Sequence, residues 1–329
     1  MRTTGLDELA AALEAQLPGR VTRDQPVAEL TTYRLGGPVG VAVRVGDDDE
    51  LDALAQLVRD ADPPVLVVGR GSNLLVADAG FAGLAVVLTG AFEDLTVEPA
   101  SGTVDAGGAV ALPVLARRAA AAGVTGLEFF VGIPGSVGGA VRMNAGGHGA
   151  ATSDVLARAW IVALTGPHAG APEVRDAATL DLGYRRSNLG PSDVVTRAEL
   201  RGSTDAPDAC ARRIDEIVRW RREHQPGGAN AGSVFRNPTG DSAGRLIDEA
   251  GCKGLRVGGA FVSSKHANFF QADPGATADD VHRLVREVRR RVADRTGVCL
   301  EPELQMVGFD APTTGGVTGG ATGSPGSST

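Results

Sequence analysis

The feature that most constrains the fold is a short apolar run that ends in two closely spaced glycines. Residues 64–69 read Pro-Val-Leu-Val-Val-Gly, and residues 70–73 continue as Arg-Gly-Ser-Asn. A continuous β-branched run is typical of a strand covered on both faces of its sheet. The glycines let the backbone approach a diphosphate, and consecutive N–H groups there can bind an anion. The third glycine of the Rossmann fingerprint would fall at Leu74, so that fingerprint is absent, and a tight strand-to-turn connection remains the alternative.

Strand and helix signals alternate along the rest of the chain. Apolar residues recur at helical spacing over 6–17 and 51–58, and apolar β-branched runs occupy 39–45 and 84–88. This alternation indicates an α/β arrangement in the first third, and later segments mix both types, so we expect α/β together with α+β in two or three domains. Further helices are expected over 112–122, over 206–224 and from Thr277, which forms a capping box with Asp280, to a stop at Gly297; further strands are expected over 160–164, 194–200 and 298–309.

Charge and cysteine content exclude several classes of function. The 329 residues carry a formal net charge of −8, which argues against a protein that binds a nucleic-acid backbone. No run of about 18 apolar residues occurs, so we expect no membrane span, and the amino terminus does not resemble a signal peptide. The odd number and wide spacing of Cys210, Cys252 and Cys299 indicate reduced thiols in a cytoplasmic protein and no zinc site.

A second glycine-rich segment spans residues 132–149 and contains seven glycines together with Ser136 and Asn144. So much backbone freedom is costly to order, which indicates a structural requirement for it. Close contact with a large planar or phosphorylated ligand would be such a requirement, and a glycine-rich turn that packs two sheets is the alternative. Two loops of this kind in one chain favour a dinucleotide ligand.

Three polar residues are candidates for chemistry. Arg185 follows Tyr184, Ser233 lies in a turn of small residues, and Glu303 alternates with Glu301 in an apolar strand. Taken one at a time, they read as a solvated arginine, a turn serine and a glutamate on an exposed strand face. The chain has no Cys/His metal pattern, no GxSxG elbow and no phosphate-binding GxxxxGK[ST] loop.

Taken together, the segments carry a resemblance. Eight of them follow one another in order, at 31–37, 69–76, 126–146, 183–188, 231–238, 243–254, 263–270 and 300–304. Over about residues 20–309 the chain resembles the UDP-N-acetylenolpyruvoylglucosamine reductases of bacterial cell-wall synthesis. The glycine loop at 132–146 and the Gly-Ser-Val-Phe-Arg-Asn-Pro segment are its most specific parts.

The resemblance implies a two-part FAD-binding domain of the vanillyl-alcohol oxidase type, followed by an α+β substrate-binding domain. The first FAD-binding part is expected at 1–88 together with 298–309, the second at 89–205, and the substrate-binding domain at 206–297. Residues 310–329 contain almost only Gly, Thr, Ser, Pro and Ala, so we expect a disordered tail there.

The resemblance also implies a reaction. NADPH reduces a noncovalently bound FAD and leaves, and the enolpyruvyl sugar nucleotide enters the same cleft. A hydride goes to the vinyl CH2 carbon, charge develops at the carbon that bears the carboxylate, and a proton completes the lactyl ether of UDP-N-acetylmuramate. The expected protein is a cytoplasmic monomer that binds a sugar nucleotide and has no nucleic-acid or membrane partner.

Site residues follow from the same resemblance. Arg185 resembles the arginine that neutralises the growing charge, Ser233 the proton donor, and Glu303 the glutamate near the substrate carboxylate. The residues implied for FAD are Tyr33, Arg34, Gly69, Arg70, Gly71, Ser72, Asn73, Leu74, Gly132, Ile133, Pro134, Gly135, Ser136, Gly138, Gly139, Ala140, Asn144 and Gly146. Those implied for the substrate are Arg221, His224, Asn237, Lys265, His266 and Asn268, and no metal ligand is implied.

The chain departs from the family in two ways, and two other functions remain as alternatives. His224 stands where the family often has lysine, and two short connections are typical of the compact subclass without a tyrosine-bearing substrate loop. One alternative is an alcohol or sugar oxidase with a similar FAD domain, in which His148 would be the candidate for a covalent flavin link. The other is a nucleotide-sugar-binding protein without catalysis, which the joint presence of Arg185, Ser233 and Glu303 disfavours.

Overall fold

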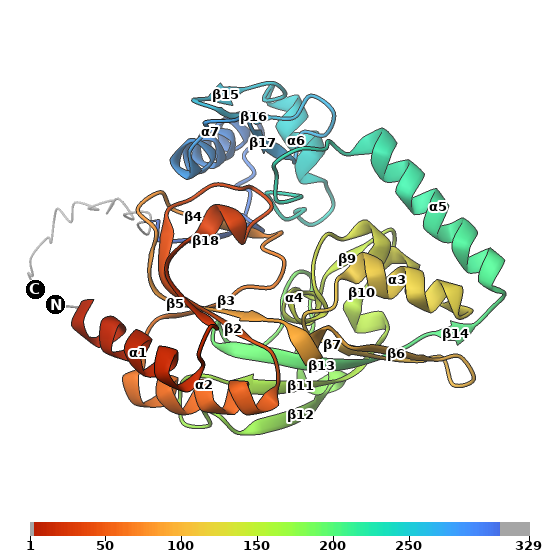
Figure 1. Ribbon diagram of the computed structural model, residues 1–329. Helices are drawn as coiled ribbons and strands as arrows, with labels where there is room; N and C mark the ends of the chain where they lie inside the picture. Colours follow the sequence, from red (N-terminus) through yellow and green to blue (C-terminus); the bar gives the residue numbers. More distant parts are fainter. Residues whose placement is uncertain (1–2, 310–329) are drawn as a thin grey trace, which may run out of the picture.

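The computed structural model describes residues 3–309, so the expected tail at 310–329 lies outside the described residues. The amino-terminal body, red to orange in Figure 1, is built on one sheet whose order is β1-β2-β5-β3. Strands β2, β5 and β3 run parallel, and β1 is antiparallel to β2. The elements of this body are α1 (Thr3–Gln16), β1 (Val21–Pro26), η1 (Val27–Glu29), β2 (Pro38–Val45), α2 (Asp48–Ala61), β3 (Val65–Val67), β4 (Leu74–Val76) and β5 (Phe81–Leu88). The predicted helices and strands of this region are confirmed.

Strand β3 differs from its predicted surroundings. Its three residues are only partly buried, whereas Val68 directly after it is buried. The reason is that all three residues line a cavity, and as the edge strand β3 also has no neighbouring strand on one side. The expectation of a strand covered on both faces was wrong for β3, although an apolar β-branched run did mark the strand itself.

The central body contains an antiparallel sheet with the order β12-β11-β13-β7-β6. Helices α3 and α4 pack on it and share its apolar core. The elements are η2 (Gly90–Glu93), β6 (Leu95–Glu98), β7 (Thr103–Gly107), α3 (Leu112–Ala121), β8 (Val124–Thr125), η3 (Glu128–Gly132), α4 (Val137–Met143), β9 (Gly146–Gly147), β10 (Ala150–Ala151), η4 (Thr152–Asp154), β11 (Leu156–Ala163), β12 (Pro172–Asp176), η5 (Ala177–Thr179), β13 (Asp193–Arg201) and β14 (Ser203–Thr204). The second glycine segment is therefore partly helical, because Ser136 caps α4 through the N–H of Gly139.

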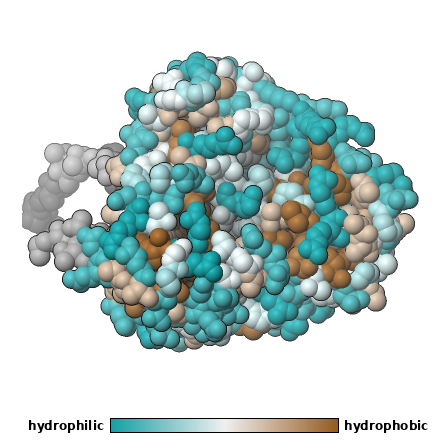
Figure 2. All heavy atoms as spheres, in the orientation of Figure 1, coloured by the Kyte–Doolittle hydropathy of each residue, from teal (hydrophilic) through white to brown (hydrophobic). Residues whose placement is uncertain are grey.

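The carboxy-terminal body is joined to the central body by the long helix α5 (Figure 1). The amino-terminal half of α5 packs against α3, where Cys210 and Ile214 are buried. In the space-filling view, hydrophobic side chains gather beside α5 and hydrophilic ones cover its outer side (Figure 2). The elements are α5 (Pro207–His224), α6 (Ala243–Glu249), β15 (Arg256–Val257), β16 (Ala260–Val262), β17 (Phe270–Ala272) and α7 (Ala278–Thr296). Within residues 3–309, no helix has both the length and the apolar character that crossing a membrane requires.

Helix α7 forms as its local signals predict. The Thr277 hydroxyl accepts a hydrogen bond from the N–H of Asp280 at 3.1 Å, and the Asp280 carboxylate accepts one from the N–H of Thr277 at 3.2 Å. This reciprocal capping box satisfies donors that the first turn leaves free. At the other end Gly297 adopts a φ of 74°, a conformation that ends a helix at low cost in glycine.

The chain then returns to the amino-terminal body. Only β18 (Gln305–Val307) is a strand, and it pairs in parallel with β4. The expected strand over 298–309 was therefore too long, because residues 298–304 cross between two bodies and bond to the loop that holds Ser233. Glu303 donates its N–H to the carbonyl of Val234 at 2.8 Å. This return segment brings the third candidate residue to the junction of the bodies.

Candidate active site

A cavity of about 440 Å³ lies where the three bodies meet. Its walls are the edge strand β3, both glycine segments, the end of α5, the turn of Arg185, the Ser233 loop and the return segment. A second cavity of about 250 Å³ adjoins it and shares Val67–Arg70, Ser136, Gly139 and Arg142. The two glycine loops that the sequence singled out therefore line one continuous hollow.

The glycines are needed where the loops approach other backbone. A Cβ on Gly71, which has a φ of 60°, would lie 2.0 Å from the carbonyl oxygen of Leu30, and a Cβ on Gly69 would lie 2.4 Å from the hydroxyl of Ser136. The tight-turn interpretation therefore explains Gly71, and contact between the two loops explains Gly69. Both glycines also line the cavity, so contact with a ligand there stays a prediction beside these structural roles.

The cavity residues fit FAD. Valine, leucine and isoleucine side chains from β3 and Ile133 supply apolar walls for a flat ring system, and the loop at 69–74 supplies main-chain N–H groups for phosphates. Arg142 adds a cation: its guanidinium donates to the carbonyls of Leu189 and Gly190, and burial lowers its pKa. The charge of the nearby Asp193 opposes this fall in pKa, but among the described residues no carboxylate lies within ion-pair distance of Arg142, so an anionic ligand would further offset the cost of burying this charge.

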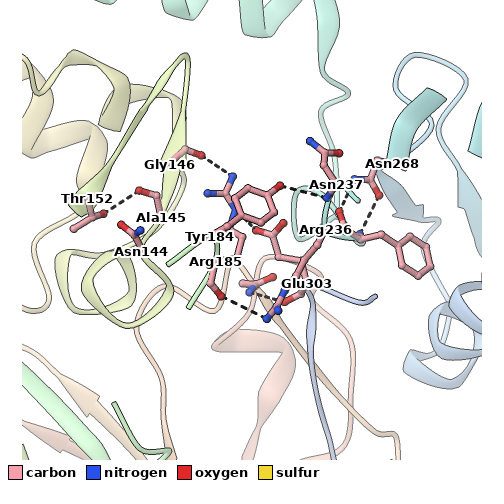
Figure 3. Close-up of polar contacts among 12 residues, drawn as sticks. Asn144, Ala145, Gly146, Thr152, Tyr184, Arg185, Arg236, Asn237, Asn268 and Glu303 are labelled. Atoms are coloured by element: carbon pink, nitrogen blue, oxygen red, sulfur yellow. Dashed lines mark hydrogen bonds and ion pairs between the residues drawn. The ribbon is translucent and has the colours of Figure 1, made fainter. Parts of the chain in front are cut away.

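Arg185 and Glu303 form an ion pair inside the cavity, with 2.7 Å between Arg185 Nε and Glu303 Oε1. Arg185 also donates to the carbonyl of Gly146 at 2.8 Å (Figure 3). Burial raises the pKa of the Glu303 carboxyl, and the nearby charges of Arg185 and Arg236 oppose that rise. The expectation that Glu303 shares an exposed face with Glu301 was wrong: their side chains are 15% and 76% exposed, because the segment is irregular there.

Asn73 links the first glycine loop to this glutamate. Its side-chain amide donates to the carbonyl of Glu303 at 3.1 Å, and the N–H of Gln305 donates to the carbonyl of Asn73 at 3.0 Å. The Asn73 side chain, which the resemblance implies for FAD, is therefore used here to position the return segment. Asn73 still lines the cavity.

Ser233 lies in a loop that Asn268 holds. The buried amide of Asn268 accepts from the N–H of Phe235 at 3.0 Å and donates to the carbonyl of the same residue at 2.8 Å. Gly232, before the serine, has a φ of 75°, and Ser233 and Phe269 form an isolated β-bridge. Ser233 lines the same cavity as Arg185 and Glu303, and among residues 3–309 no group bonds to its hydroxyl.

Most residues implied for FAD line the cavity, but four do not. Tyr33 is buried in the core of the carboxy-terminal body and donates to the carbonyl of Phe270 at 3.0 Å, and Arg34 next to it is exposed. Burial raises the pKa of Tyr33. Asn144 is buried below the cavity wall, where its amide donates to Gly183 at 2.9 Å, and Gly138 lines only the adjoining cavity.

The residues implied for the substrate divide in a similar way. Arg221 lines the cavity and donates to Gln225 at 2.7 Å, and burial lowers its pKa. His224 stacks on Trp220 with 4.7 Å between ring centroids, and the Lys265 ammonium donates to the carbonyl of Arg222. None of the following lines the cavity: His224, Asn237, Lys265, His266 and Asn268. Their contact with a substrate stays a prediction.

Sequence reasoning missed several residues of the cavity wall. Arg142, Met143 and Gln225 line the cavity, and a lone arginine inside a glycine-rich segment was the one available signal for them. His148, the candidate for a flavin link, does not line the cavity but packs against Trp220 at 5.0 Å. Residues 3–309 contain no cluster of three or more His, Cys, Asp or Glu side chains that could hold a metal ion.

The chain is similar in sequence and fold to known proteins. A family model described as "FAD binding domain" matches residues 39–167, and one described as "UDP-N-acetylenolpyruvoylglucosamine reductase, C-terminal domain" matches residues 224–307. The UDP-N-acetylenolpyruvoylglucosamine reductase of Rhodopseudomonas palustris strain HaA2 is 42% identical, over 94% of this chain and 99% of its own length. That of Acidiphilium cryptum strain JF-5 is 46% identical, over 89% and 93%. The crystal structure of the reductase from Thermus caldophilus aligns with a TM-score of 0.74 and 38% identity, over 87% of this chain and 98% of that one.

Proposed function

The chain belongs to the UDP-N-acetylenolpyruvoylglucosamine reductase family, and from this premise we propose how its own side chains divide the work of the reaction. The chain is a flavin-dependent oxidoreductase with FAD as cofactor and NADPH as reductant. It reduces the enolpyruvyl group of UDP-N-acetylglucosamine enolpyruvate to UDP-N-acetylmuramate in peptidoglycan precursor synthesis. Residues 69–74, 132–136 and 139–140 would hold FAD, which would supply hydride transfer from NADPH to the vinyl CH2 carbon of the substrate.

Arg185 stabilises the charge that develops beside the substrate carboxylate. Its Nε is paired with Glu303 and its NH2 nitrogen with Gly146, and no other group among residues 3–309 engages its NH1 nitrogen. The guanidinium is therefore fixed by two of its nitrogens while the third can face the substrate. A cation held in this way stabilises the transition state more than the ground state, because the oxyanion it meets exists only after hydride transfer.

Ser233 supplies the proton that completes the lactyl ether. Ser233 lines the cavity, and the loop that carries it is held by the buried Asn268. A serine hydroxyl is a weak acid in water, but the carbon that receives the proton is far more basic. Because Asn268 holds this loop, we expect the hydroxyl to protonate one face of the carbon and so favour one stereochemical outcome.

Glu303 acts through Arg185. Its carboxylate holds the guanidinium Nε, and its own main chain is fixed by Asn73 and Val234. The charge on Glu303 offsets that of Arg185 before the substrate arrives, so the buried cation does not lack a partner in the free enzyme. Arg221, which also lines the cavity and has no carboxylate partner among the described residues, binds the diphosphate of the sugar nucleotide.

We also propose a domain organisation, an oligomeric state and a cellular location for the protein. The FAD-binding part is formed by residues 1–88 with 298–309 and by 89–205, and 206–297 forms the substrate-binding part; the pairing of β18 with β4 supports the first grouping. The protein acts in the cytoplasm as a monomer. Its three free cysteines support a reducing compartment, as do NADPH and the sugar nucleotide, both intracellular metabolites.

The observation that carries this assignment is that Arg185, Ser233 and Glu303 come from three separate segments and line one cavity with both glycine loops. Stopped-flow flavin absorbance tests it. NADPH should bleach the flavin and the enolpyruvyl sugar nucleotide should restore it; Ser233→Ala should keep the first step and slow the second by about 100-fold or more. Ser203→Ala, at an exposed serine on β14, is the matched control. If Ser233→Ala loses both steps while Ser203→Ala loses neither, Ser233 is a structural residue.

A further inference from the structure

Arg185 lies in a backbone conformation that needs support. It is at the tip of a tight turn closed by two hydrogen bonds between Gly183 and Arg186, at 3.1 and 3.2 Å. Its φ is 56°, in the left-handed region that residues with a Cβ rarely adopt. Such a conformation persists only where surrounding contacts hold it, and those contacts are candidates for a functional role.

Tyr184, the other residue at the tip of this turn, makes two of the supporting contacts. The Arg185 guanidinium carbon lies 5.1 Å from the centroid of the Tyr184 ring, within cation–π range. The Tyr184 hydroxyl accepts a hydrogen bond from the N–H of Asn237 at 3.3 Å. Figure 3 shows the ring beside the guanidinium, with its hydroxyl directed at Asn237. The Tyr184 ring therefore contacts Arg185, and its hydroxyl bonds to Asn237, which follows the Ser233 loop in the chain.

A second contact joins the same two segments. Arg236 directs one guanidinium nitrogen at the carbonyl of Arg185, at 3.5 Å. Residues 184–185 belong to the central body and residues 236–237 to the carboxy-terminal body, so the turn is attached across the junction that the cavity occupies. The Tyr184 side chain is 53% exposed and contributes little to any core. Its position is therefore explained by these contacts and not by packing.

We infer that Tyr184 is a positioning residue for Arg185: its ring orients the guanidinium toward the cavity, and its hydroxyl fixes the turn relative to the Ser233 loop. This rests on the proposed catalytic role of Arg185. The ring covers one face of the guanidinium, which limits its rotation away from the substrate. The hydroxyl fixes the position of Arg185 relative to Ser233, so the cation and the proton donor meet the same substrate molecule at a fixed distance from each other.

The test compares Tyr184→Leu and Tyr184→Phe in the two half-reactions of the FAD-loaded enzyme. Tyr184→Leu removes ring and hydroxyl and should slow flavin reoxidation by the enolpyruvyl substrate about tenfold, within the range for one lost cation–π contact, with NADPH reduction unchanged. Tyr184→Phe restores the ring and should recover all but about threefold of the rate. Val174→Ala, at an exposed valine on β12, is the control for a surface change. Flavin content and circular dichroism report folding.

A double-mutant cycle separates this inference from the proposed function. In an Arg185→Gln background, Tyr184→Leu should change the reoxidation rate by less than about twofold, because the group it positions is gone. An equal tenfold loss in both backgrounds, or an unchanged rate in Tyr184→Leu alone, would overturn the positioning role. If Arg185→Gln itself leaves reoxidation intact, the proposed function of Arg185 fails instead.

Discussion

The Arg185 guanidinium and the Glu303 carboxylate meet at 2.7 Å in the cavity, although one side chain extends from a turn of the central body and the other from the return segment. Burial raises the pKa of Glu303, while the charge of Arg185 lowers it. The pair is therefore the place in the molecule where pH should act on the substrate half-reaction.

Acidification should slow flavin reoxidation by the substrate as Glu303 takes up a proton, because a neutral carboxyl no longer holds the Arg185 guanidinium as an ion pair. Since the pKa of Glu303 is raised, the decline should begin at a higher pH than an exposed glutamate would give. Glu303→Gln should remove this acid limb and lower the rate at neutral pH by about 100-fold. Reoxidation rates across the acidic pH range measure both effects.

The contribution of Glu303 to the free energy of unfolding should change with pH in the opposite direction to the reoxidation rate. A raised pKa means that folded Glu303 binds its proton more tightly than the unfolded chain does, so its contribution favours folding at low pH and is lost as the pH rises through the folded-state pKa. Protonation of Glu303 therefore favours the folded state, and a loss of rate on acidification is not caused by unfolding that this residue drives. An acid limb that persists unchanged in Glu303→Gln would assign the titration to another group.

Arg236→Met should shift that acid limb to higher pH. The positive charge of Arg236 is one of the causes that lower the pKa of Glu303, so its removal leaves the carboxyl easier to protonate. Arg236→Lys keeps a charge at this position and should give a smaller shift. The comparison is made on the midpoint of the acid limb, since both variants also change the contact with the Arg185 carbonyl. Identical midpoints in the wild type and Arg236→Met would show that this cation does not influence Glu303.

Local signals predicted the helices better than the last strand. In α7 the capping box, the apolar stripe and the terminal glycine all lie in the one continuous segment from Thr277 to Gly297, so the local sequence contains the whole determinant. Residues 298–304 alternate like a strand, but no neighbouring strand is available as they cross between bodies. Their conformation is set by bonds to Val234 and Asn73, which are distant in sequence.

The same contrast applies to the site. The glycine loops could be found because glycine spacing is itself a local record of close backbone approach. The burial of Glu303 could not, because it depends on the meeting of three bodies, and alternation with Glu301 suggested an exposed face. Only the order of eight family-like segments indicated the joint role of Arg185, Ser233 and Glu303. That order gave no hint of the contacts of Tyr184, which cross between bodies.

Asn268→Ala should destabilise the carboxy-terminal body by roughly 2–4 kcal/mol, because it leaves the buried N–H and carbonyl of Phe235 without partners. Urea unfolding at a fixed FAD concentration measures the free energy of unfolding. Asn188→Ala is the control: that side chain is exposed and donates to Thr179 at 2.8 Å, so its loss should cost under about 1 kcal/mol. Equal effects of the two substitutions would mean that Asn268 does not hold the Ser233 loop.

Gly69→Ala should weaken FAD binding by about tenfold or more, because the new Cβ would lie 2.4 Å from the Ser136 hydroxyl and force the two glycine loops apart. The next nearest atom is the Ser136 Cβ at 3.6 Å, an ordinary contact, so removing the hydroxyl should relieve the clash. The double variant Gly69→Ala/Ser136→Ala should therefore bind FAD more tightly than Gly69→Ala, although Ser136→Ala alone loses the cap of α4. Gly147→Ala, where no atom lies within 4 Å of the new Cβ, should leave binding unchanged. Fluorescence titration of the apoprotein with FAD gives the dissociation constants of the wild type and the four variants, and an absence of recovery in the double variant would refute contact between the loops as the cause.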